Sequence, residues 1–144
     1  MIRLQACFLA DRAIANPDGT FMVWRGGISN SFSSVFPAPL QYALVLRLEL
    51  DEESARDLHS VGIRILFNDV EIAPTQTAPV AVAPPPAGEQ FSYFTLLANL
   101  RLAVGSPGTG EIQVRVDEDI AGPRLRFTVV SYDPSQAPPI DTSN

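Results

Sequence analysis

The clearest pattern in the chain is an alternation of apolar and other side chains between residues 40 and 50. Leucine or tyrosine stands at every second position: Leu40, Tyr42, Leu44, Leu46, Leu48 and Leu50. A period of two places all six side chains on one face of a β-strand. The positions between them begin mixed and end in Arg47 and Glu49, which is typical of a face that emerges into water. We therefore predict a half-buried strand here.

Other segments repeat this period. They are residues 2–10, 61–67, 94–104, 112–116 and 125–129. We predict a hairpin between the first of these and residues 20–24, across the Asn-Pro-Asp-Gly turn at 16–19. A second tight turn is predicted at Asn68–Asp69, leading into residues 70–72.

A last hairpin is expected to cross residues 117–123 and to pair two apolar triplets: Ile112, Val114 and Val116 with Leu125, Phe127 and Val129. Seven or eight short strands joined by Gly and Pro turns favour an all-β fold. We predict an antiparallel β-sandwich of the immunoglobulin-like kind, with a partly closed β-barrel as the alternative.

Four segments lack the alternation. Residues 29–36 have no period and are predicted to be a surface loop, and residues 51–59 an acidic connection with one helical turn. Residues 73–88 are rich in proline, which cannot donate to a central ladder, so we expect an edge ribbon or an extended loop. Residues 1–133 are predicted to form one domain, and residues 134–144, with Ile140 as their single core-type side chain, a disordered tail.

Composition narrows the class of protein. The 144 residues carry 16 acids and 10 positive charges, all of them arginine, for a net charge of −6. This balance disfavours binding to nucleic acids or to anionic membranes. No segment has the roughly 18 apolar residues that span a bilayer, and charge interrupts the first residues too early for a signal peptide. We therefore expect a soluble cytoplasmic protein, in which Cys7, the single cysteine, is a buried structural thiol.

The sequence holds little that points to catalysis. His59 is the single histidine and lies in a charged connection, so we expect a solvated surface residue. Ser60 follows it, but adjacency does not orient an imidazole, and no Gly-x-Ser-x-Gly elbow is present. One cysteine and one histidine cannot make a zinc cluster, and the glycines of residues 105–110 fit a hairpin turn better than a phosphate loop. We predict neither catalytic residues nor a cofactor.

Two acidic connections leave one metal hypothesis open. Residues 51–57 and 117–119 carry carboxylates that calcium could use if the fold brings them together. The residues of this alternative are Asp51, Glu52, Asp117 and Asp119. Solvated turns are the simpler interpretation of the same residues, and a carboxylate acid–base pair ranks third.

Aromatic and apolar residues outside the alternating pattern could form a binding surface or cover an open end of the sandwich. The aromatic ones are Trp24, Phe32, Phe36, Phe91, Tyr93 and Tyr132. Our interaction candidates are Trp24, Phe32, Phe36, Val80 and Val82. The first functional hypothesis is a non-enzymatic protein-binding or assembly module, including self-association into a homo-oligomer, acting through sheet edges and loops. The calcium-dependent binding module is the alternative.

Several segments together resemble an uncharacterised family of small bacterial β-sandwich proteins, a domain of unknown function. The segments that carry the resemblance are residues 8–11, 19–27, 37–40, 43–50, 110–117 and 125–129. The resemblance spans residues 2–130. It implies the sandwich fold and brings no established activity, so the function must be argued from the residues themselves.

Overall fold

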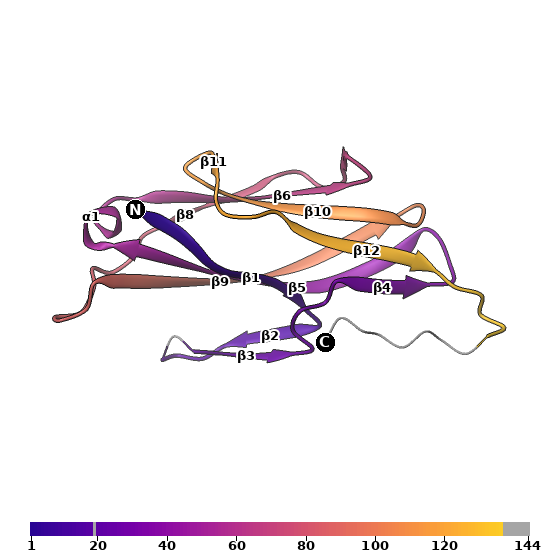
Figure 1. The fold of residues 1–144 in the computed structure, drawn as a ribbon, viewed down its shortest axis with the longest axis horizontal. Helices are drawn as coiled ribbons and strands as arrows, with labels where there is room; N and C mark the ends of the chain where they lie inside the picture. Colours follow the sequence, from indigo (N-terminus) through magenta and orange to yellow (C-terminus); the bar gives the residue numbers. More distant parts are fainter. Residues whose placement is uncertain (19, 137–144) are drawn as a thin grey trace.

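The computed structural model describes residues 1–18 and 20–136, whose strands form three sheets (Figure 1). A three-stranded sheet has the order β1 (Ile2–Ala10), β5 (Ala38–Asp51), β9 (Phe91–Val104). A seven-stranded sheet has the order β4 (Asn30–Ser33), β12 (Leu125–Ser131), β10 (Gly108–Val116), β6 (His59–Phe67), β7 (Val70–Glu71), with β8 (Gln76–Val80) also on β6 and β11 (Asp119–Ile120) on β10. A two-stranded sheet joins β2 (Arg12–Ala15) to β3 (Phe21–Trp24), and α1 is one short helix (Glu52–Ala55).

The hydrophobic core lies between the two larger sheets. The six alternating side chains of β5 are all buried there, as the two-residue period predicts. From the opposite sheet, Ile63, Ile112 and Phe127 pack into the same core. The prediction of an all-β, mainly antiparallel fold is confirmed, and none of the sheets in the described part of the chain closes into a barrel.

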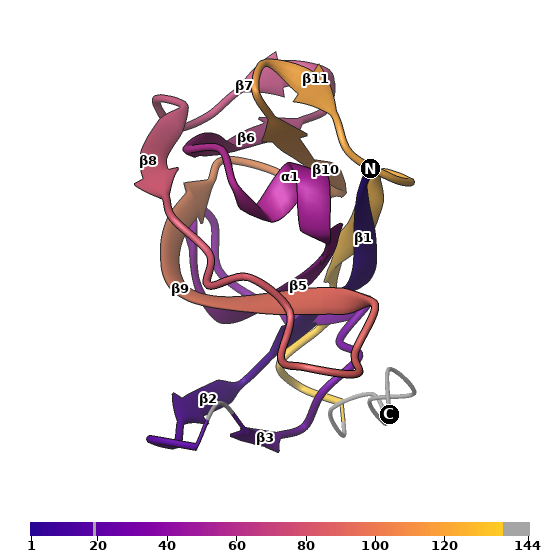
Figure 2. The same cartoon turned by 90° about the vertical axis from the view of Figure 1, so that its left-hand side faces the viewer.

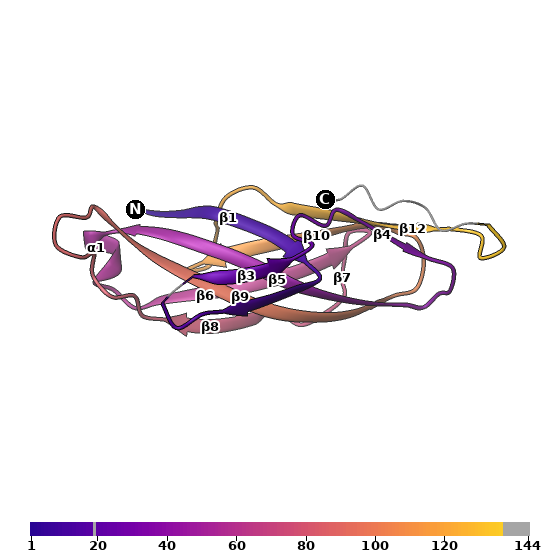
Figure 3. The same ribbon diagram turned by 90° about the horizontal axis from the view of Figure 1, so that it is seen from below.

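The other face of β5 does not emerge into water as predicted. Ala43 and Val45 are buried, because the β2–β3 hairpin folds back under the three-stranded sheet (Figures 2 and 3). Farther along, Glu49 is buried and its carboxylate lies 2.8 Å from the guanidinium of Arg3 on β1. A neighbouring segment therefore covers most of a face that the sequence pattern alone marks as solvated.

The structure differs from three more predictions. Residues 20–24 form a hairpin with β2 and not with the first strand, because β2 is the strand that leads directly into the turn, whereas β1 ends at Ala10. Residues 30–33 are not loop but strand β4, which runs parallel to β12. In the last hairpin Ile112 does lie opposite Leu125, whereas Phe127 lies opposite Gly110. A polar, aperiodic strand such as β4 gains its partner only through long-range pairing.

The remaining predictions mostly hold. The tight turn at Asn68–Asp69 is present, with φ of 48° and 65°, and the acidic connection contains the single helical turn α1. The proline-rich segment was expected to be an edge ribbon or an extended loop, and it contains both. Its strand β8 is an edge strand paired with β6, and the chain from β8 to β9 forms no strand. Most of the predicted disordered tail, Ile140 included, lies outside the described residues, as does Gly19. No helix in the described ranges is long and apolar enough to cross a membrane.

Candidate protein-binding groove

Strand β9 is the longest strand at a sheet edge in the described part of the chain. All 14 of its residues pair with β5 on one side. On its other side no strand of the described residues pairs with it, since β9 ends the order of the three-stranded sheet. Strands at sheet edges present unpaired backbone N–H and C=O groups, which are a template for pairing with another chain. This side of β9 therefore lacks strand pairing, although the preceding chain approaches its first residues, where the Ser92 hydroxyl donates a hydrogen bond to the carbonyl oxygen of Ala83 at 2.6 Å.

A groove of about 460 Å³ opens along the first part of this edge. Four parts of the chain line it: the tip of the β2–β3 hairpin with Asp18 and Thr20, Arg47 of β5, the chain at residues 82–86, and residues 91–95 of β9 itself. Figure 2 shows the chain between β8 and β9 crossing in front of β9, with the β2–β3 hairpin below the strand. We call this feature the β9 groove. It lies along the first residues of a strand whose outer edge pairs with no described strand.

Arg47 supplies the positive charge of the groove. Its guanidinium lies 4.3 Å from the centroid of the Tyr93 ring, a geometry that favours a cation–π contact. The Nε of Arg47 is buried and makes no hydrogen bond to any described residue. A carbonyl or carboxylate oxygen is the acceptor that such a group takes. The groove thus combines an aromatic wall with a donor whose hydrogen-bonding capacity is unused.

A second surface of interest is the outer face of the β2–β3 hairpin. Ile14, Met22 and Trp24 share this face and are 39%, 52% and 41% exposed. The guanidinium of Arg12 lies over the Trp24 ring, 5.2 Å from its centroid. The residues on the opposite face, among them Val23, turn toward the three-stranded sheet. Exposed apolar side chains gathered on one small hairpin are a feature of interaction surfaces.

The five interaction candidates from the sequence separate in the structure. Trp24 is exposed on the hairpin, and Val82 packs against the core while lining the β9 groove. Phe32 is half-buried in β4, Phe36 packs against the core, and Val80 is only 4% exposed. Sequence reasoning did not select Arg47 or the edge of β9. The exposed tyrosine that completes the groove, Tyr93, was among the aromatic residues noted.

His59 is not the solvated surface residue that the sequence indicated. It is the first residue of β6 and is 9% exposed, because α1 and the turn after β10 close over it. Its Nδ1 lies 2.6 Å from a carboxylate oxygen of Asp117, and its Nε2 lies 2.6 Å from the carbonyl oxygen of Ser54. Both partners accept hydrogen bonds, so both ring nitrogens must donate, which favours the imidazolium. The Ser54 carbonyl and the Asp117 carboxylate accordingly raise the pKa of His59.

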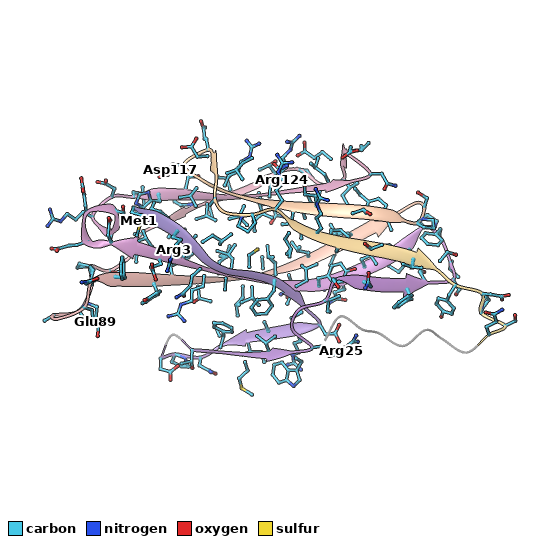
Figure 4. The ribbon with its side chains drawn as sticks, in the orientation of Figure 1. Met1, Arg3, Arg25, Glu89, Asp117 and Arg124 are labelled. Atoms are coloured by element: carbon cyan, nitrogen blue, oxygen red, sulfur yellow. The ribbon has the colours of Figure 1, made fainter. Side chains whose placement is uncertain are left out.

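Three of the four acidic residues of the calcium alternative have partners within the fold, and the fourth, Asp119, is exposed in β11. Asp117 accepts from His59 and from the backbone N–H of Ser60 at 2.9 Å, and these bonds lower the pKa of its carboxyl. Asp51 caps α1 by accepting from the Ser54 N–H at 2.9 Å, and Glu52 pairs with Arg56 at 3.1 Å. Asp117 and Met1 lie toward the same end of the molecule (Figure 4). Across residues 1–18 and 20–136 no three His, Cys, Asp or Glu side chains are arranged to hold a metal.

Calcium is therefore expected to leave the stability of the protein unchanged. A ligand that binds only the native state raises the melting temperature, so millimolar calcium should shift it by no more than about 1 °C. The measurement is a thermal melt with calcium and, for comparison, with chelator. A calcium-dependent rise of several degrees would restore the acidic connections as a metal site.

Neither a scan against protein-family models nor a search of curated proteins found a match to this chain. The resemblance to the small bacterial β-sandwich family therefore stays a prediction.

Proposed function

We propose that this chain is a non-enzymatic protein-binding module that receives an extended segment of a partner as an additional strand along β9. The observation that carries the proposal is the edge of β9 with which no described strand pairs, together with the groove along its first residues. We further propose that the two larger sheets, which face each other across one apolar core, form an immunoglobulin-like β-sandwich. In such a fold a free edge strand extends its own sheet when a partner binds.

Addition of a strand to β9 would use both the backbone of β9 and the aromatic and charged side chains of the groove. Main-chain hydrogen bonds to β9 would supply affinity for any extended segment, and side-chain pockets would select among sequences. Tyr93 and Phe91 offer apolar surface at the start of the strand. The Arg47 guanidinium, which lines the groove, is a cation that carbonyl or carboxylate oxygens of the bound segment would favour. Binding would thus complete interactions that the free chain leaves open.

A catalytic role has less support from the geometry. Both nitrogens of His59 are occupied by Asp117 and the Ser54 carbonyl, and in the described residues no hydroxyl group hydrogen-bonds to the imidazole. A general base needs a free nitrogen within hydrogen-bond reach of the proton that it takes. The contacts of His59 are those of a structural group that joins α1, β6 and the turn after β10.

The proposal is tested by selecting binders from a phage-displayed library of random 12-residue peptides on the immobilised full chain. Selected peptides are expected to bind the chain and to bind Tyr93→Ala at least about tenfold more weakly, the loss typical of a central interface aromatic. The matched control is Trp24→Ala, which removes the exposed aromatic of the hairpin and should leave binding unchanged. The reverse pattern would place binding on the hairpin, and failure to enrich any peptide would count directly against the module.

A further inference from the structure

We propose that the extended segment received by β9 is β9 of a second copy of this chain, paired antiparallel about a two-fold axis at Leu97. This inference rests on the proposed function, because it names the occupant of the same open edge. The three-stranded sheets of the two copies would then join into one continuous six-stranded sheet. Such isologous pairing uses one surface patch twice.

The sequence of β9 is self-complementary about Leu97. Residues on the face of β9 away from the core are Tyr93, Thr95, Leu97, Asn99 and Arg101. In an antiparallel pair centred on Leu97, each leucine lies opposite its own copy. Thr95 then faces Asn99, a hydroxyl against an amide, and Tyr93 faces Arg101, an aromatic ring against a cation. Each of these is a favourable cross-strand combination.

The other face of β9 fits the same register. On the core side, Phe94 would lie opposite Leu100 of the second copy, and Leu96 opposite Ala98. Phe94, Leu96 and Ala98 pack against the core but are only half-buried, although they point inward. Their partial exposure follows from the position of β9 at the edge of its sheet. A neighbouring strand would cover them and add to apolar burial.

Charge in the groove also fits a second β9. Arg101 is exposed, and in the described residues its side chain makes no ion pair or hydrogen bond. The pairing brings it to Tyr93 of the other copy, at the groove that Asp18 lines. Asp18 accepts hydrogen bonds from the backbone N–H and the hydroxyl of Thr20, which hold its pKa low and its carboxylate charged. Because Arg47 already occupies one face of the Tyr93 ring, the incoming Arg101 is expected beside Asp18.

The two-fold axis provides a sharp test by cysteine cross-linking. In a Cys7→Ala background, Leu97→Cys should form a disulfide-linked dimer on mild oxidation, because the two copies of residue 97 are directly opposite, with Cβ atoms about 5 Å apart. Thr95→Cys alone and Asn99→Cys alone should not, because each is displaced from its own copy by four residues, about 13 Å. A mixture of these two variants should give the mixed dimer. This second arm does not depend on tolerance of a cysteine at position 97.

Solution mass provides the complementary measurement. The unmodified chain is expected to show the mass of two copies by light scattering, with dissociation on dilution, and Arg101→Glu should shift it toward one copy. A single-copy mass at every concentration, or cross-linking at position 95 alone but not at 97, would overturn self-pairing. If library peptides nevertheless bind at Tyr93, strand addition stands and only the identity of the occupant is wrong. If neither peptides nor a second copy bind, both proposals fail.

Discussion

Replacing Gly110 with alanine is expected to destabilise the fold by about 3 kcal/mol, a cost at the upper end for an overpacked core. Gly110 on β10 lies between two phenylalanines, opposite Phe127 on β12 and Phe67 on β6. The Phe127 ring occupies the space that a side chain at position 110 would need. The Phe127 ring cannot easily move to make room for the added methyl group. It is only 1% exposed and packs edge-on against Tyr42, with ring centroids 5.7 Å apart.

Chemical denaturation of three variants measures this effect. Gly105→Ala is the matched control, because a side chain at position 105 meets open space, and its stability should equal that of the parent chain. Gly110→Ala combined with Phe127→Leu should be more stable than Gly110→Ala alone, since the smaller side chain leaves room. Equal stability of the Gly105 and Gly110 variants would show that Phe127 does not lie over β10 in this way.

Removing the imidazole in His59→Gln is expected to lower stability by about 1 to 2 kcal/mol at pH 6, the scale of charge-assisted hydrogen bonds reduced for the partly exposed Asp117. The pKa of His59 is raised in the folded chain, so its contribution is fully present below its unfolded pKa, about 6.5, and is lost as pH rises through the folded pKa. The pKa of Asp117 is lowered, so its contribution is lost as pH falls through that folded value. The pair therefore stabilises the fold most between these limits.

Denaturation curves from pH 5 to pH 9 test this pH dependence. The parent chain should lose stability on the alkaline side while His59→Gln stays flat there. Burial raises the pKa of the Cys7 thiol to about 11, so the cysteine does not add to the change in this range. A pH profile that is the same in both chains would mean that the pKa of His59 does not differ between the folded and the unfolded chain.

The strands that carry a regular alternation could be predicted from the sequence. β5 and β9 are recognisable because each buries a row of apolar side chains, and a period of two is a local property. β4 could not be found in this way, because Asn30 and Ser31 carry no such pattern and the strand exists only through pairing with β12. The solvated second face predicted for β5 was wrong for a similar reason. Nothing near Ala43 in the sequence shows that the β2–β3 hairpin covers it.

The candidate site was harder to predict than the fold. Tyr93 and Val82 attract attention singly, but the groove exists because Asp18, Arg47 and residues 91–95 converge from distant parts of the chain. His59 shows the same limit. Its partner Asp117 stands 58 positions later, so sequence neighbours alone indicated a solvated residue. Contacts between residues far apart in the sequence form both the groove and the surroundings of His59. The hydrophobic periodicity of a segment carries no information on such contacts.

The central claim is that the edge of β9 is open in the free chain and becomes paired when a partner binds. The most direct measurement is amide hydrogen exchange along β9 by NMR, on dilute monomeric chain, with and without a peptide selected from the library. In an antiparallel ladder alternate residues donate to β5, so every second amide of β9 should exchange rapidly in the free chain and slow when the peptide is bound. Uniformly protected β9 amides in the free monomer, or new protection confined to the β2–β3 hairpin, would contradict the account.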